Sequence, residues 1–294
     1  MLRRVITGAL AVAATVVFYA GWRWVRPGRE PAPPDPAGAH AEHVYFSSLD
    51  GTRLHGLYLP GRDDYPTVLL CHGYAKSLAE PWDIGLRLNR AGYNTFFLEF
   101  RACGQSGGRY TTMGYKETWD LLAAVHYVKV AYGRKPIGVL SISMGAAVAI
   151  MAAARSPELA AVVADSPYAD LQGVLRHKVS DFVILPWLVP LGWLSIRLGQ
   201  RLAGFQAAQV RPIDYVQDIA PRPLLLIYGQ RDRFIPAEQA QQLFRRAGEP
   251  KEIWLAPDSD HAVARLDHPE EYLRRVLAFL DGYLLERQAA ASSP

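Results

Sequence analysis

The sequence predicts an α/β protein built on a mainly parallel, eight-stranded sheet with helices on both faces. Short apolar or β-branched runs alternate with helical stretches along most of the chain, and most runs are continuously apolar, as in strands buried on both faces. The first two runs are joined by Asp50-Gly51, a strong hairpin signal, so this pair is expected to be antiparallel. With 294 residues, half of them hydrophobic and a fifth charged, the chain can bury the core of one large domain.

The individual elements follow from this alternation. Strands are expected at 43–49, 54–59, 67–71, 94–100, 137–141, 161–164, 224–228 and 252–255. Helices are expected at 82–91, 117–131, 145–154, 238–246 and 270–285. The last helix should close the domain by packing an apolar stripe on the sheet, since hydrophobic residues recur in it at helical spacing: Tyr272, Val276, Phe279, Leu280 and Tyr283.

The N-terminus carries an apolar segment. No charge occurs from Val5 to Trp22, a stretch close to the shortest that spans a hydrocarbon core, and Arg3 and Arg4 precede it. Residues 1–26 are therefore predicted to form an uncleaved membrane-anchor helix, with a cleavable signal peptide as the alternative. A short basic start before a long domain favours a domain that lies outside the cytoplasm.

Composition sets the remaining boundaries. A segment rich in Pro, Gly and Ala, 27–42, is predicted to be a linker, 43–286 the folded domain and 287–294 a flexible tail. Within the domain, 171–216 interrupts the alternation, and its apolar part, 182–191, contains Pro186 and Pro190. We expect this insertion to form a lid over a functional site; a subdomain that merely packs on the sheet is the alternative.

Charge and cysteine content exclude several classes of protein. The net charge is +4, and the densest basic group, Arg23, Arg26 and Arg29, follows the apolar segment, which favours anionic lipid headgroups over nucleic acid. Cys71 and Cys103 lack C-x-x-C spacing and are expected to be free thiols near strand ends. Neither a phosphate-binding glycine loop nor a metal-ligand spacing is present, so no cofactor and no metal is predicted.

A serine lies where an apolar strand should turn sharply into a helix of small residues, in Ser141-Ile142-Ser143-Met144-Gly145. Such a turn exposes the serine above the sheet edge at the N-terminus of the helix, where negative charge is favoured. Here the chain resembles the α/β-hydrolase superfamily, with Ser141 in place of the first glycine of G-x-S-x-G. The resemblance makes Ser143 the nucleophile and leaves Ser141, inside the strand, as the alternative.

A serine nucleophile needs an imidazole base and a carboxylate that orients it. Asp232 follows the strand expected at 224–228, His261 follows the strand expected at 252–255, and the order Ser, Asp, His matches the superfamily. The resemblance therefore implies Asp232 as the acid and His261 as the base. Asp165 is the rival acid, and His268, the rival base, is expected instead to cap the last helix.

Acyl transfer also needs two donors for the oxyanion. Cys71-His72-Gly73-Tyr74 resembles the His-Gly-x element of the superfamily, which implies the backbone N–H groups of Tyr74 and Met144 as these donors and a structural role for His72. The turn at 99–106 looks like the architectural Asp-x-Arg-Gly-x-Gly-x-Ser turn of the superfamily. In pattern the chain is closest to the serine-aminopeptidase and monoacylglycerol-lipase-like branches.

These observations predict a membrane-anchored serine hydrolase that cleaves a carboxylic ester or thioester of a small acyl or lipid-like molecule. A peptidase or amidase is the alternative enzyme, although only Asp170 and Asp181 lie near the lid to bind a peptide amine. The alternative from another class is a catalytically silent, anchored binding protein. The intact set of Ser143, Asp232 and His261 favours the enzyme.

Overall fold

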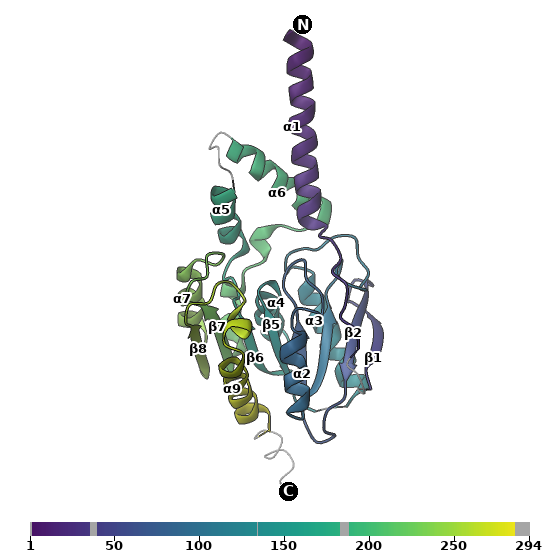
Figure 1. Cartoon of the computed structure of the whole chain (residues 1–294), viewed down its shortest axis with the longest axis vertical. Helices are drawn as coiled ribbons and strands as arrows, with labels where there is room; N and C mark the ends of the chain where they lie inside the picture. Colours follow the sequence, from purple (N-terminus) through teal and green to yellow (C-terminus); the bar gives the residue numbers. More distant parts are fainter. Residues whose placement is uncertain (1, 36–39, 134, 183–187, 286–294) are drawn as a thin grey trace.

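The computed structural model describes residues 2–35, 40–133, 135–182 and 188–285, without the side chains of 2–6, 9–10 and 180–182. Its centre is one eight-stranded sheet in the order β1-β2-β4-β3-β5-β6-β7-β8 (Figure 1). Only the pairs that involve β2 are antiparallel; the others are parallel. The strands are β1 (Glu42–Ser47), β2 (Arg53–Leu59), β3 (Thr67–Cys71), β4 (Asn94–Glu99), β5 (Ile137–Ile142), β6 (Leu159–Asp165), β7 (Leu224–Gly229) and β8 (Lys251–Ala256).

Each predicted strand is present, and the hairpin at Asp50-Gly51 joins β1 to β2 as expected. The predicted helices are present as α2 (Trp82–Arg90), α3 (Glu117–Ala131), α4 (Met144–Ala153), α7 (Ala237–Arg246) and α9 (Pro269–Leu280). The last differs from the prediction, because the regular α-helix ends at Leu280 and a π-helical turn continues over Asp281–Leu285. A short helix, α8 (Ala264–Asp267), precedes it and was not predicted.

The N-terminal segment forms one long helix, α1 (Leu2–Val25), which projects from the domain (Figure 1). Its last turns do not stand free: Val17, Gly21 and Val25 are buried, and this part packs against α6 (Val189–Ala203). Among the described residues, no helix combines the length and the apolar character needed to cross a membrane. The predicted membrane-spanning helix is therefore not supported.

The segment predicted to be a linker lies against the domain where it is described. The Arg29 guanidinium donates to the carbonyl oxygens of Gly104 and Ser106, both at 2.5 Å. Further along, Glu30 accepts a hydrogen bond from the backbone N–H of Ser77 (3.1 Å). These contacts tie the chain that follows α1 to the turn after β4 and to the loop after β3.

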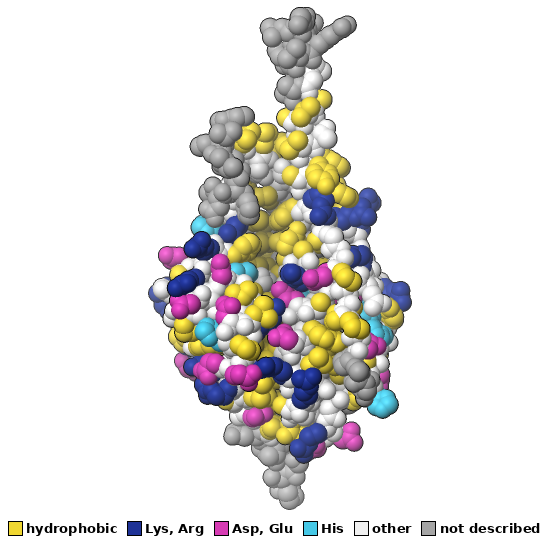
Figure 2. Space-filling model, viewed as in Figure 1, with side chains coloured by type: hydrophobic (Ala, Val, Ile, Leu, Met, Phe, Trp, Pro, Cys, Tyr) yellow, Lys and Arg dark blue, Asp and Glu magenta, His cyan; other side chains and the backbone are white. Residues whose placement is uncertain are grey.

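The insertion after β6 forms a cap over the carboxyl ends of the parallel strands. It contains α5 (Leu171–Phe182), α6 and the 3-10 turns η2 (Ala207–Gln209), η3 (Pro212–Asp214) and η4 (Val216–Ile219). Of the predicted apolar stretch 182–191, positions 183–187, with Pro186, lie outside the described residues. Between the cap, α1 and the domain below, Figure 2 shows a hollow whose visible wall is hydrophobic.

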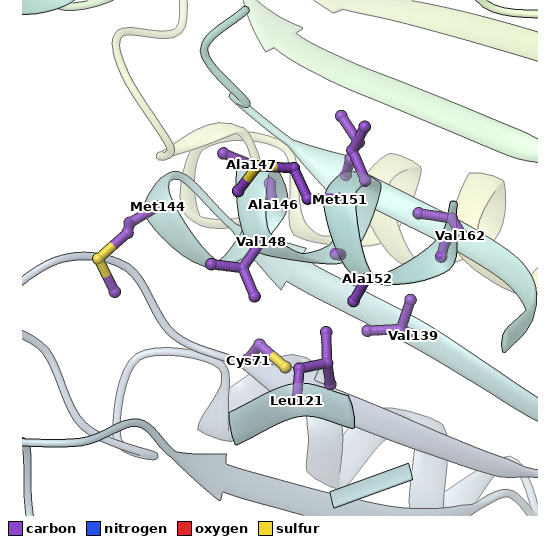
Figure 3. Close-up of a cluster of buried hydrophobic side chains, with 14 of the residues drawn as sticks. Cys71, Leu121, Val139, Met144, Ala146, Ala147, Val148, Met151, Ala152 and Val162 are labelled. Atoms are coloured by element: carbon purple, nitrogen blue, oxygen red, sulfur yellow. The ribbon is translucent and has the colours of Figure 1, made fainter. Parts of the chain in front are cut away.

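The core lies on both faces of the sheet, as continuously apolar strands require. In β3, Leu69 and Cys71 point to the side covered by α3, α4 and α7, while Val68 and Leu70 point to the side covered by α2 and α9. Every residue of α4 is buried, and Figure 3 shows its alanines and Met151 in one cluster with Val139 and Val162 of the sheet. Small side chains let this helix approach the sheet closely, which fixes the turn that precedes it.

Candidate active site

Ser143 occupies a strained turn between β5 and α4. Its backbone has φ 53° and ψ −113°, a region that non-glycine residues rarely adopt, and its N–H donates to the carbonyl oxygen of Asp165 (2.7 Å). Close packing holds the turn, because a Cβ at Gly145 would lie 2.6 Å from the His72 carbonyl oxygen. The strain raises the Ser143 side chain above the sheet edge. Ser141, two residues earlier, is fully buried in β5.

The side chains of Ser143, His261 and Asp232 form one hydrogen-bonded chain. Ser143 Oγ lies 2.8 Å from His261 Nε2, and His261 Nδ1 lies 2.8 Å from Asp232 Oδ2. The other oxygen of Asp232 accepts the backbone N–H groups of Phe234 and Ile235, both at 2.8 Å. The aspartate side chain is 5% exposed and the histidine 19%, so the carboxylate is fixed and the imidazole can be reached from the pocket.

The rival residues have other partners. The carboxylate of Asp165 is fully buried and accepts the hydroxyls of Ser166 (2.9 Å) and Tyr272 (3.1 Å), and burial raises its pKa. His268 stands at the cap position of α9, as predicted, but its Nε2 bonds the Pro257 carbonyl oxygen (2.7 Å) instead of the helix. The structure thus brings His261 and Asp232 to Ser143, and neither rival.

His72 has the structural contacts expected of it. The Phe100 N–H donates to its Nε2 (3.1 Å), so the proton is on Nδ1, which donates to the Gly73 carbonyl oxygen (2.7 Å). Burial lowers the pKa of His72, which keeps the ring neutral. These bonds hold the loop after β3 beside Ser143, and the Cβ of Ser143 would lie 3.3 Å from a Cβ placed on Gly73.

The backbone N–H groups of Tyr74 and Met144 are the donors expected for the oxyanion. Gly73 N–H donates to the Glu80 carboxylate (2.5 Å), whereas the N–H groups of Tyr74 and Met144 donate to no acceptor in the described part of the chain. Met144 is the first residue of α4, where backbone N–H groups are free of helical partners. Both residues line the pocket that contains Ser143.

Above Ser143 and His261 lies a pocket of about 830 Å³. Most of its wall is apolar: α5 contributes Leu171, Val174, Leu175 and Val179, and α6 contributes Ile196. Among the lining residues that the structure describes, the only carboxylate is Glu80, which is bonded to Gly73; the side chain of Asp181, the second acid expected near the lid, lies outside the described residues. Asp170, one of the two acids expected near the lid, instead accepts the N–H groups at the start of α5, Gln172 (3.2 Å) and Gly173 (3.0 Å).

Two local electrostatic effects concern the ends of the strands. Burial raises the pKa of the Cys71 and Cys103 thiols to about 12, and both cysteines are free, as predicted.

Asp260 accepts the backbone N–H groups of Arg233 and His261, and these bonds lower its pKa. Asp260 thereby ties the acid loop to the base loop. Within the described ranges, no cluster of three or more His, Cys, Asp or Glu side chains could hold a metal ion.

Several site residues were not predicted from the sequence. The Phe234 ring stacks on His261, with ring centroids 4.8 Å apart, and Lys178 Nζ lies 4.6 Å from the centroid of the Phe234 ring. Ser166 Oγ accepts the Ala262 N–H (3.1 Å), which anchors the base loop. Phe234 lies two residues after the predicted acid, so its closeness in sequence was the available signal.

The comparisons with known proteins agree with this geometry. Residues 66–188 match the family described as the α/β-hydrolase fold. The protein Rv2307c of Mycobacterium tuberculosis is 30% identical over 230 residues, which are 77% of this chain and 73% of that protein. The chain belongs to the α/β-hydrolase family.

Among solved structures, the chain is similar to the esterase Pf2001 of Pyrococcus furiosus, with 31% identity and a TM-score of 0.74 over 89% of this chain and 98% of that one. The protein YqkD of Bacillus subtilis is 27% identical over 239 residues, which cover 80% of this chain and 77% of that protein. The predicted family is thus confirmed, while the branch within it stays a prediction.

Proposed function

We propose that the protein is a serine hydrolase that cleaves a carboxylic ester through an acyl-Ser143 intermediate. The observation that carries the proposal is the unbroken chain of 2.8 Å contacts from Ser143 Oγ through His261 to Asp232, at the floor of an apolar pocket. The similarity to an enzyme described as an esterase supports it.

In the first half of the reaction, His261 Nε2 takes the proton from Ser143 Oγ as this oxygen attacks the ester carbonyl. Asp232 fixes the ring so that Nε2 faces the serine, and it stabilises the imidazolium that forms. The oxyanion accepts hydrogen bonds from the N–H groups of Tyr74 and Met144. The C–O bond to the alcohol then breaks, and His261 returns the proton to the departing oxygen.

In the second half, a water molecule takes the place of the alcohol. His261 accepts a proton from this water, whose oxygen attacks the acyl carbon. The bond to Ser143 Oγ breaks, the carboxylic acid leaves, and the proton on His261 returns to the serine. A thioester would react by the same steps.

The pocket supports an apolar substrate. Its walls from α5 and α6 are lined by aliphatic side chains, which bind an acyl or lipid-like chain by excluding water from it. A peptide amine would need an acidic partner in the pocket, and the Glu80 carboxylate already accepts the Gly73 N–H. The pocket therefore favours an ester of an apolar acid or alcohol over a peptide.

We also propose that α1 brings the enzyme to a membrane surface, with the hydrolase domain outside the cytoplasm. Four large apolar side chains of α1, Val12, Val16, Phe18 and Tyr19, are exposed, and the basic residues Arg23 and Arg26 follow them. Cell fractionation tests the association and protease treatment of intact cells tests the side. Recovery of the full-length chain in the soluble fraction would contradict this proposal.

Labelling with a fluorophosphonate probe tests the enzymatic function. Wild type is expected to react, Ser143→Ala to lose labelling and Ser141→Ala to retain it, because only Ser143 contacts His261. A panel of esters, thioesters and amides then identifies the scissile bond. Absence of labelling in folded wild type would point instead to a catalytically silent binding protein.

A further inference from the structure

Helix α1 contributes to the same pocket as the reacting serine. Ala20, Gly21 and Trp24 line this pocket together with Ser143 and His261, although they lie at the opposite end of the sequence from the base. The N-terminal helix therefore forms part of the wall of the pocket that contains the aliphatic side chains of α5.

Close packing on α6 fixes the position of α1. A Cβ at Gly21 would collide with the carbonyl oxygen of Ser195, and a Cβ at Gly199 would lie 2.7 Å from the carbonyl oxygen of Gly21. Residues without a side chain let two helix backbones approach this closely. The glycines thus determine how near α1 stands to the cap.

Hydrogen bonds also join the end of α1 to the loops around the serine. The Tyr74 hydroxyl donates to the Trp24 carbonyl oxygen (2.6 Å), and the Thr111 N–H donates to the Val25 carbonyl oxygen (2.9 Å). The Trp24 ring packs on Phe205 of the cap, with centroids 6.1 Å apart. Since Tyr74 is also a proposed oxyanion donor, α1 is anchored directly to the reaction centre.

We propose that the end of α1 is the specificity-determining wall of the pocket, and that Ala20 and Trp24 set the length of the apolar chain that the enzyme accepts. Four residues that line the pocket here have small side chains or none: Ala20, Gly21, Gly192 and Ser195. They leave room in the pocket for a medium or long chain beside Ser143. The substrate class is therefore an ester with an extended aliphatic chain. This inference rests on the proposed ester hydrolysis.

The test is the ratio of kcat/KM for p-nitrophenyl decanoate to that for p-nitrophenyl acetate, measured on the full chain. Ala20→Phe adds a large side chain that narrows the pocket and is expected to lower this ratio about tenfold, the scale on which pockets discriminate chain length. Trp24→Ala removes a large side chain, which widens the pocket, and is expected to raise the ratio about threefold. The two variants change the volume of the pocket in opposite directions.

Ala14→Phe is the matched control, because Ala14 lies on the same helix, is exposed and does not line the pocket. Its ratio should stay within about twofold of wild type. An unchanged ratio in either folded variant, as judged by circular dichroism and fluorophosphonate labelling, would overturn the inference. If wild type hydrolyses none of the esters, the proposed function fails instead, so the two failures are distinguishable.

Discussion

The floor and the roof of the pocket are built in different ways. The floor carries Ser143, Asp232 and His261 on short turns at the ends of β5, β7 and β8, and the parallel pairing of β5, β6, β7 and β8 holds these turns in register. The roof consists of α5 and α6 from the insertion after β6 and of α1 from the other end of the chain, and α1 packs on α6 through Gly21 and Gly199. The three side chains are therefore positioned by strand pairing, while the shape of the pocket above them depends on how α1, α5 and α6 pack.

The first prediction tests which carboxylate orients His261. Asp232→Asn is expected to lower kcat about 10⁴-fold, because the amide cannot hold the imidazole with Nε2 free to accept the serine proton. Asp165→Asn should lower kcat less than about tenfold, since it bonds hydroxyls rather than His261. Steady-state kinetics with a short ester measure both. If Asp165→Asn lowered kcat more than Asp232→Asn, the acid that orients His261 would be Asp165, at the end of β6.

The second prediction concerns the buried ion pairs of Arg101, in the turn after β4, and their effect on the free energy of unfolding. Arg101 is buried and bonds Asp120 (2.6 Å) and Asp50 (2.7 Å), so Arg101→Leu leaves a buried carboxylate unpaired and should cost about 3–5 kcal/mol in the free energy of unfolding. The matched control is Arg87→Leu, which removes an exposed pair with Glu270 and should cost less than about 1 kcal/mol. Urea unfolding measures both. Equal losses would show that the buried pair is not what stabilises the turn after β4.

The third prediction concerns Phe234, which lies where roof and floor meet. Phe234→Leu removes the ring that stacks on His261 and should lower kcat about three- to tenfold, as the imidazole becomes less well oriented. Phe234→Tyr keeps the ring and should restore most of the rate. If the leucine and tyrosine variants lose the same activity, stacking is not the cause.

The smallest effect is expected at the two thiols. Burial raises the pKa of Cys71 and Cys103 to about 12, so both stay protonated at every pH well below that value and gain a reactive thiolate only as the pH approaches it. A thiol-reactive chromogenic disulfide at pH 8 should therefore not react with the folded enzyme and should react with two thiols in urea. Rapid reaction of the folded protein would show that the strand ends open.

The floor could be predicted from the sequence because its signals are local. Continuously apolar runs such as 137–141 mark strands buried on both faces, and the residues that follow them, Ser143 among them, must lie at one edge of a parallel sheet. The order of Ser143, Asp232 and His261 supplied the rest. Each of these inferences needs only a few neighbouring residues.

The roof could not be predicted in the same way. The contact between Gly21 and Gly199 joins positions far apart in the chain, and no local pattern specifies which helix packs on which. The apolar character of α1 therefore suggested a span, although its last turns pack on protein. The small residues Gly192, Ser195 and Gly199 at helical spacing were the one available sign that another backbone approaches α6.

The anchoring of Trp24 and Val25 to the domain affects how the protein should be produced. Apolar N-terminal helices are often deleted to improve solubility, and a recombinant chain that starts at Glu42 would retain every strand together with Ser143, Asp232 and His261. It would lack one side of the pocket and the oxygen that accepts the Tyr74 hydroxyl. Such a shortened enzyme would react with an active-site probe yet report a substrate preference that does not belong to the full-length protein.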